Sequence, residues 1–186
     1  PADFNTGIFG NGLELNGSNY VSVPDSMDVA RTGSNLSVST WFRVDTFDKS
    51  WQCLVAKGEG SNWRIHRQSG NDNLAFAGGS SDIVGSNVND GQWHHVLAVS
   101  EAGVSTRLFI DGALVATGNG PGLAANGEPM MVGENPDAGG RQWKGRVDDL
   151  GIFSSALNGH QAKAIYDLAL DSEFEYSLGE VNQLLS

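Results

Sequence analysis

Alternation of apolar and polar residues runs through most of this chain and constrains its fold more than any other feature. In the segment 36–44, Leu36 and Val38 share one face of an extended strand, whereas Ser37 lies on the other. We expect further strands wherever this period of two recurs, at residues 8–15, 20–23, 52–57, 63–67, 73–77, 82–86, 93–100, 106–110, 113–116, 130–132 and 146–153. Helical period is absent before residue 158, so the pattern predicts an all-β fold and excludes an alternating α/β fold.

Glycine-containing turns separate these segments. The chain has 25 glycines, and the pair Asp111-Gly112 joins two expected strands by a two-residue loop, the strongest short-range signal for a hairpin. About a dozen strands at this spacing are typical of two antiparallel sheets packed face to face. The sequence therefore predicts a two-sheet antiparallel β-sandwich, or jelly roll.

The C-terminal part of the chain departs from the alternating pattern. Asn158 is a candidate N-cap for a short C-terminal helix, which we expect to join the sandwich in one domain over residues 1–170. Residues 171–186 are either a second short helix packed on the sandwich or the start of a linker, because Ser177-Leu-Gly-Glu180 is a capping-box pattern. The apolar residues on one face of the first helix are Ala162, Ile165 and Tyr166.

Charge and cysteine content exclude several kinds of partner and site. The chain has 22 acidic and 11 basic residues and a net charge of −11, which repels phosphate backbones, so we expect no nucleic-acid partner. No apolar run reaches the length of a membrane span, and we expect no membrane insertion. Cys53 is the only cysteine, which excludes an intrachain disulfide. His94 and His95 are neighbours on an expected strand, point to opposite faces and cannot bind one metal ion together.

Four motifs, in order along residues 7–168, resemble the laminin G-like family of bacterial secreted proteins, which has the concanavalin A-like jelly-roll fold. They are Gly12–Val23, Leu36–Trp41, Asp90–Val96 with Leu108–Gly112, and Lys144–Phe153 with Ala156-Leu157. The resemblance implies a β-sandwich that works outside the cell, either secreted or at the cell surface. Binding modules, lectins, adhesins and hydrolases all use this fold, so the resemblance does not choose among these functions.

The carboxylates do not form the pair that a hydrolase requires. Retaining glycoside hydrolases use two carboxylates about 5 Å apart, and on this fold the two share one strand face. Asp148 and Asp149 are adjacent and point apart, whereas Glu173 and Glu175 lie in the tail outside the expected sandwich. We therefore expect no enzymatic activity.

Trp51 is the best candidate for an exposed aromatic platform, because it lies at a loop end just before an expected strand. Sugar-binding proteins stack flat aromatic rings on pyranose faces and place polar side chains at the edges. Arg64, His66 and Arg67 would line a groove with Trp51; the alternative is that they are solvated strand residues. We expect the other tryptophans to pack in the core: Trp41, Trp63, Trp93 and Trp143.

The segment 134–142 gathers carboxylate and amide oxygens, the donors that calcium prefers, on a glycine-rich loop. It is similar to the pentraxin calcium loop, although Pro136 departs from that pattern. A solvated acidic turn is one alternative, and an ion at Asp148 or Asp149 is another. The calcium ligands expected in this segment are Glu134, Asn135, Asp137 and, by the similarity, Gln142, with Glu59 or Asn62 of a second loop to complete the shell.

These observations together predict a non-catalytic extracellular recognition module. A glycan or polysaccharide is the expected partner, and calcium is the expected ion at its binding site. A protein–protein adhesion module and a structural spacer in a multidomain surface protein are the alternatives.

Overall fold

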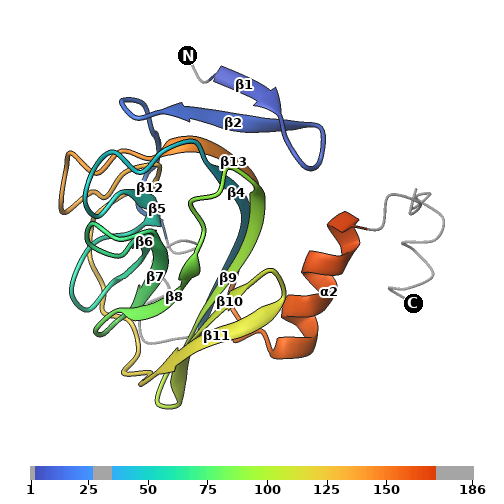
Figure 1. Cartoon of the computed structure of the whole chain (residues 1–186). Coiled ribbons are helices and arrows are strands. Elements are labelled where there is room, and N and C mark those ends of the chain that lie inside the picture. The colour runs from blue at the N-terminus through green and yellow to red at the C-terminus, as the bar shows by residue number, and fades with distance from the viewer. Residues whose placement is uncertain (1–2, 27–34, 171–186) are drawn as a thin grey trace.

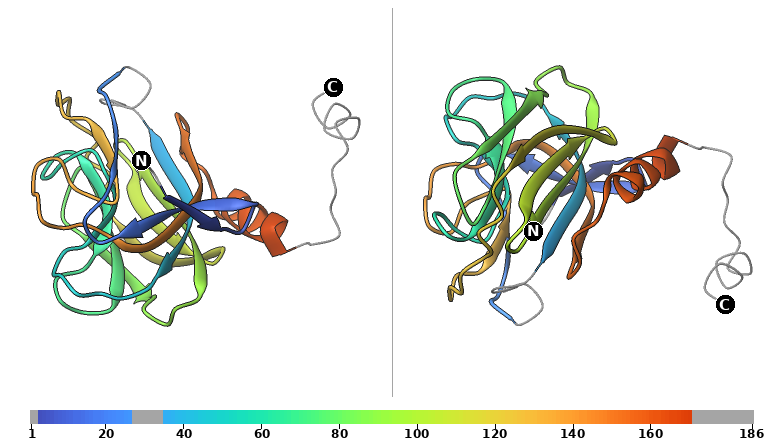
Figure 2. Two further views of the ribbon diagram at one scale, coloured as in Figure 1. Left: turned by 90° about the horizontal axis from the view of Figure 1, so that it is seen from above. Right: turned by 90° about the horizontal axis from the view of Figure 1, so that it is seen from below.

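The computed structural model describes residues 3–26 and 35–170, which form two antiparallel sheets packed face to face and one helix (Figures 1 and 2). One sheet has seven strands in the order β1-β2-β13-β4-β9-β10-β11, and the other has six in the order β3-β12-β5-β6-β7-β8. The predicted all-β sandwich is confirmed. The elements are β1 (Asp3–Thr6), β2 (Asn11–Asn16), β3 (Val21–Val23), β4 (Leu36–Val44), β5 (Cys53–Ala56), β6 (Trp63–Arg67), β7 (Asn73–Gly78), β8 (Ile83–Asn87), β9 (Trp93–Glu101), β10 (Ser105–Ile110), β11 (Ala113–Gly118), β12 (Met130–Val132), β13 (Lys144–Phe153) and α2 (Gly159–Leu170).

The core lies between the two sheets and is filled by every second residue of the strands. On β4, Val38 and Phe42 are fully buried in it, and Ile65 and Phe76 face them from the six-stranded sheet. Each such side chain contributes about 1.5–3 kcal/mol when it leaves water, which makes this layer the main stabilising feature of the fold. The expected hairpin between β10 and β11 is also present, with Asp111 and the following glycine both at positive φ.

The helix α2 packs on the outer face of the seven-stranded sheet (Figure 1). Asn158 caps it as predicted: its Oδ1 accepts a hydrogen bond from the Gln161 N–H at 3.1 Å, and Gln161 Oε1 accepts from the Asn158 N–H at 2.9 Å. Ala162 is fully buried against the sheet, and Tyr166 stacks on Trp41 with ring centroids 5.5 Å apart. The outer face of this sheet is therefore buried where α2 covers it and open to solvent elsewhere.

The first strand was not predicted, and the segment 8–15 is shorter as a strand than expected. A turn closed by the Gly7 N–H and the Gly10 carbonyl, 2.9 Å apart, occupies residues 7–10, so β2 begins only at Asn11. The turn folds the preceding residues 3–6 back as β1, which pairs with β2 as an edge strand. Its single apolar residue, Phe4, gives no alternating pattern from which a strand could be recognised.

Three of the four tryptophans expected in the core are buried, and the fourth is not. Trp41, Trp63 and Trp143 are at most 2% exposed. Trp93 is only half-buried, so the expectation that it fills the core is wrong. It opens β9 directly opposite Arg43, on the outer face of the seven-stranded sheet, in phase with the outward residues of β4.

The predicted alternatives for residues 171–186 fall outside the described residues. Within residues 3–26 and 35–170, no helix has both the length and the apolar character needed to cross a membrane.

Candidate functional site

Trp51 lies half-buried in the loop that enters β5. Its backbone has a φ of 64°, a left-handed conformation that residues other than glycine rarely adopt, and its N–H donates to the Ser69 carbonyl at 2.9 Å. Its ring centroid lies 5.5 Å from that of His66 and 5.8 Å from the guanidinium carbon of Arg141. Backbone strain of this kind persists only where the surroundings enforce it, and here it fixes the direction of an aromatic ring.

Ion pairs connect the side chains around this ring. Arg64 lies 2.8 Å from Asp82 and 3.1 Å from Glu59, and Arg141 lies 2.6 Å from the other oxygen of Glu59. His66 Nε2 lies 3.2 Å from the same Asp82 oxygen that pairs with Arg64. We call Trp51 with these four charged residues, Glu59, Arg64, Asp82 and Arg141, the Trp51 surface.

Asp82 remains ionised in this arrangement. Partial burial by itself would raise the pKa of Asp82, but the hydrogen bond from His66 and the charges of His66 and Arg64 outweigh it, so the pKa lies below its ordinary value. The Trp51 surface therefore offers both cationic donors and anionic acceptors at the edge of an aromatic ring. This combination suits the hydroxyl groups of a sugar, each of which donates and accepts.

Two of the predicted ligand-binding side chains, Arg67 and His66, instead make buried structural contacts. Arg67 is 8% exposed, and its guanidinium donates to the carbonyls of Lys49, Gly70 and Asn71 at 2.6–2.7 Å. His66 is 1% exposed, and its Nδ1 donates to the Arg67 carbonyl at 2.8 Å. The Arg67 guanidinium holds the loops on either side of β6, and the His66 ring packs against the Trp51 ring. Both side chains are buried, and neither presents a polar group to solvent.

Sequence reasoning missed two members of the Trp51 surface. Asp82 follows a Gly-Gly-Ser-Ser run, and the pattern predicts only that it begins the strand 82–86. Arg141 is the one basic residue within the oxygen-rich segment 134–142, and a basic residue in a candidate calcium loop is itself a signal of competition for the carboxylates. Their partners lie 16 and 82 residues away, which no local pattern reveals.

Five of the six expected calcium ligands do converge. Glu134 is 4% exposed, and its two oxygens accept hydrogen bonds from the N–H groups of Asn135, Gly140 and Arg141 and from the Gln142 amide. This single buried carboxylate closes the loop from 134 to 142. The other converging contacts are those of the Asn135 amide with Glu59 at 2.6 Å and of the Asp137 carboxylate with the Glu59 N–H at 2.9 Å.

The sixth expected ligand, Asn62, faces a different neighbour. Its amide nitrogen donates to the Ala124 carbonyl at 2.9 Å, and its Oδ1 is buried without a partner. It therefore ties the β5–β6 loop to the segment before β12 and does not join the other five.

The donors of this loop do not fit a calcium shell as they are arranged. Calcium needs six to eight free oxygens, whereas those of Glu134 and one of Glu59 already accept N–H donors or a guanidinium. Among residues 3–26 and 35–170, no three His, Cys, Asp or Glu side chains are placed to hold one metal ion. Calcium at this loop stays a prediction.

At the alternative ion site, Asp148 or Asp149, the oxygens of Asp148 also already accept N–H donors. Asp148 Oδ2 accepts from the N–H groups of Ile8 and Phe9 at 2.8 and 2.9 Å, and Oδ1 accepts from the N–H of Asp149 at 2.9 Å. Asp148 therefore satisfies the backbone donors of the N-terminal turn. Asp149 is exposed at a bulge in β13 with a φ of 49°.

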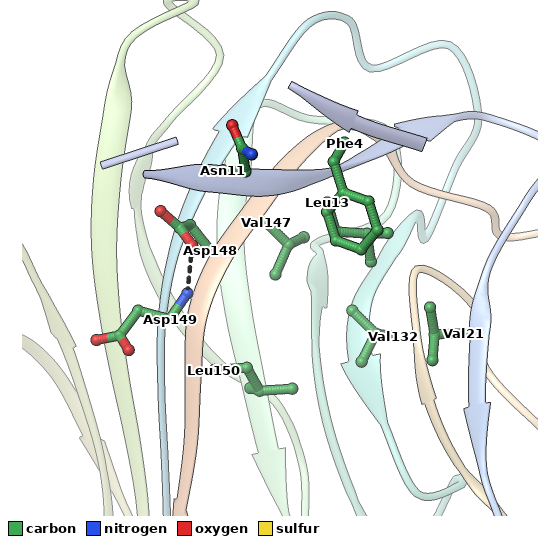
Figure 3. A pocket seen from close by; sticks show the side chains of 9 residues that line it. All are labelled: Phe4, Asn11, Leu13, Val21, Val132, Val147, Asp148, Asp149 and Leu150. Atoms are coloured by element: carbon green, nitrogen blue, oxygen red, sulfur yellow. Dashed lines mark hydrogen bonds between the residues drawn. The ribbon is translucent and has the colours of Figure 1, made fainter. Parts of the chain in front are cut away.

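A hollow of about 230 Å³ opens beside this bulge, between the β1–β2 hairpin and the strands β3, β12 and β13 (Figure 3). Its wall is mainly apolar, and Figure 3 shows the Asp149 carboxylate directed away from the apolar side chains. A surface of this kind suits an apolar group better than a sugar. The apolar residues that line it are Phe4, Leu13, Val21, Val132, Val147 and Leu150.

His94 and His95 point to opposite faces of β9, as expected, and their pKa values shift in opposite directions. The hydrogen bond to Asp111, 2.7 Å from Nδ1, raises the pKa of His94 with help from Asp90. Burial lowers the pKa of His95 to about 4, although Asp111 opposes this shift. Neutral His95 lies 2.8 Å from Ser39 Oγ beneath α2, with no described partner for its Nδ1.

Mild acid should therefore destabilise the fold through His95. The folded-state pKa is depressed, so its contribution is present above about pH 6.5 and is lost as the pH falls towards 4. We expect this residue to account for a loss of about 2 kcal/mol in unfolding free energy between pH 7 and pH 5. Urea unfolding at both pH values should show a smaller loss in His95→Gln than in the wild type. Equal losses in the two proteins would contradict the assignment.

Comparison with known proteins gives one family and several structures. The family model described as the concanavalin A-like lectin/glucanases superfamily matches residues 15–163. No curated protein matches the sequence. The fold is similar to the binding domain of Paraclostridial Mosquitocidal Protein 1, at 18% identity and a TM-score of 0.77, over 92% of this chain and 46% of that one.

Two further structures share the fold. Domain 4 of AbnA, a GH43 extracellular arabinanase from Geobacillus stearothermophilus in complex with arabinotriose, has 21% identity and a TM-score of 0.68, over 89% of this chain and 81% of that one. The binding domain of botulinum neurotoxin serotype G has 13% identity and a TM-score of 0.71, over 96% of this chain and 47% of that one. This chain thus spans about half the length of the toxin binding domains, and likeness at these identities shows the fold alone.

Proposed function

The chain belongs to the concanavalin A-like lectin/glucanases superfamily, and from this we propose that it is a non-catalytic module that binds carbohydrate outside the cell. The observation that carries the proposal is the Trp51 ring, held by a strained backbone beside paired charged groups. The arabinanase domain gives support, since a domain of comparable length with this fold forms a complex with arabinotriose. Toxin binding domains and a secreted hydrolase among the similar structures support an extracellular location.

The proposal that the module is non-catalytic rests on its carboxylates. Glu59, Asp82 and Glu134 already accept hydrogen bonds or ion pairs from arginine, histidine or N–H donors, so none of the three is a free carboxylate. A retaining hydrolase needs one carboxyl group that stays protonated near neutral pH beside a free carboxylate about 5 Å away.

The first test is a glycan array followed by titration of the best ligand, with arabinan oligosaccharides included. Trp51→Ala should weaken binding about tenfold or more, because the stacking surface is lost. Phe9→Ala is the matched control, since Phe9 is 49% exposed on the far hairpin turn, and its affinity should equal that of the wild type. Equal affinity for Trp51→Ala and the wild type would remove the Trp51 surface from the binding site.

The calcium prediction has a separate test. Because the oxygens of Glu134 and Glu59 already accept donors, we expect the same melting temperature in millimolar calcium and in a chelator. An ion that bound only the native state at 100 times its Kd would add about 2.7 kcal/mol and raise the melting temperature clearly. A calcium-dependent rise that Glu59→Gln abolishes would restore the calcium site at this loop.

A protein partner is the second candidate, and the apolar hollow beside β13 is the observation that favours it. A hollow of about 230 Å³ is large enough for one aromatic or branched side chain of a partner. This second function would be favoured over the first by two results together. The glycan array would show no bound glycan, and a protein ligand of this chain would bind the Val21→Asp variant more weakly than the wild type.

A further inference from the structure

One part of the outer face of the seven-stranded sheet is left uncovered by α2. A row of four residues crosses it, one from each of four neighbouring strands. The register places Glu14 of β2 opposite Arg146 of β13, Arg146 opposite Arg43 of β4, and Arg43 opposite Trp93 of β9. All four side chains are half-buried, which leaves each of them partly open to solvent.

The charges in this row are not balanced within the described residues. Arg43 and Arg146 are directly opposite on adjacent antiparallel strands, where like charges repel. Arg43 is paired, because its guanidinium donates to Asp45 at 2.6 and 3.1 Å. Glu14, the other neighbour of Arg146, accepts instead from the Asn5 amide at 2.8 Å.

Arg146 differs from the other arginines of residues 3–26 and 35–170, each of which has a carboxylate within 4.0 Å. Those pairs are Arg43–Asp45, Arg64–Asp82, Arg67–Asp72, Arg107–Glu101 and Arg141–Glu59. Arg146 donates one hydrogen bond, from Nη1 to the Thr6 carbonyl at 3.1 Å, and its buried Nε has no partner. In a chain with a net charge of −11, an arginine that has no carboxylate partner among the described residues can bind an external anion.

We propose that this row, Glu14–Arg146–Arg43–Trp93, binds a saccharide that carries a carboxylate, with the sugar ring against Trp93 and the carboxylate against Arg146. A guanidinium fork matches a carboxylate in two parallel hydrogen bonds, and an indole ring provides the flat apolar surface for the sugar. Glu14 accepts hydroxyl hydrogen bonds at the far end. The row lies on the sheet opposite to the Trp51 surface, so it is a second site and goes beyond the proposed function.

The experiment is titration of the whole chain with trigalacturonic acid and with its fully methyl-esterified form. The two ligands share the sugar ring, and only the first carries negative charge. We expect trigalacturonic acid to bind at least about tenfold more tightly than the ester, and Arg146→Gln to weaken its binding about tenfold. In NMR spectra of the isotope-labelled protein, the resonance of the Trp93 indole N–H should shift on addition of trigalacturonic acid.

Three variants give the controls. Arg107→Gln removes a charge from the same face of the same sheet, at a residue already paired with Glu101, and should leave the affinity unchanged. Trp51→Ala should also leave it unchanged, which separates a failure here from a failure of the proposed function. Arg146→Lys keeps the charge without the fork and should restore only part of the affinity, provided that its melting temperature equals that of the wild type.

Equal affinity for the acid and its ester overturns the proposal, as does wild-type affinity in Arg146→Gln. It is also overturned if trigalacturonic acid does not bind at about 1 mM, or if a sulfated neutral oligosaccharide binds and the acid does not.

Discussion

Trp143→Ala is expected to lower the free energy of unfolding by about 3–5 kcal/mol, the largest loss that we expect from a single substitution in this sandwich. Trp143 is fully buried where the loop after β12 meets β13. Its ring meets the edges of Phe42 and Phe47 at centroid distances of 5.9 and 5.4 Å, and its Nε1 donates to the Arg43 carbonyl at 3.3 Å. Alanine would leave a cavity that Phe42, fixed on β4, and Phe47, in the loop after β4 beneath the Arg67 guanidinium, cannot fill.

The measurement is urea unfolding of the variant and the wild type, with the m-value checked to be unchanged. Trp93→Ala is the matched control, because it removes the same side chain from a half-buried position. It should lower the free energy of unfolding by only about 1 kcal/mol. Equal losses for the two variants would mean that the packing assigned to Trp143 is wrong.

Lys57→Ala is expected to lower the free energy of unfolding by about 2–4 kcal/mol, although it removes a charged residue. The Lys57 side chain is fully buried, and its Nζ donates to Asp25 at 2.7 Å, to Asn126 at 3.0 Å and to the Glu128 carbonyl at 2.6 Å. Without it these acceptors lose their common donor. The Asp25 side chain is 36% exposed, so water compensates part of the loss.

The control for Lys57 is Lys144→Ala. Lys144 also pairs with an aspartate, Asp48, at 3.7 Å, but both side chains are more than 40% exposed. An exposed pair of this kind contributes about 0–1 kcal/mol, so we expect little change in the urea midpoint. A second variant, Lys57→Met, keeps the aliphatic volume and should lose nearly as much stability as Lys57→Ala. Recovery of stability in Lys57→Met would show that packing, and not the shared hydrogen bonds, is what Lys57 supplies.

The strands were predictable because one side of each sheet faces a common core. The segments 63–67 and 130–132 match β6 and β12 residue for residue, and the Asp111-Gly112 pair locates a hairpin. Edge strands with a single apolar residue, such as β1, lie beyond this reasoning. Trp93 was misplaced because its motif position does not tell which face of a sheet is covered by a helix.

The site was predictable only in part, for a different reason. Trp51, Arg64 and the loop from 134 to 142 do come together, so residue type located the region. Residue type could not show that Arg141 forms an ion pair with the Glu59 carboxylate, or that the side-chain hydrogen bonds of Arg67 all go to loop carbonyls. Oxygen-rich loops that bind a cation and those that bind an arginine have the same composition, and only the long-range pairing separates them.

The position of β13 has a consequence for how the protein is made. It is the last strand of the described residues, yet it lies inside the seven-stranded sheet between β2 and β4. While a ribosome has yet to synthesise residues 144–153, β4 presents an unpaired edge and the β1–β2 hairpin has no strand to join. Completion of this sheet must wait for nearly the whole domain to emerge, which makes it slow and exposes the nascent chain to aggregation. Fragments that stop before residue 144 should accumulate as insoluble protein, whatever the stability of the complete sandwich.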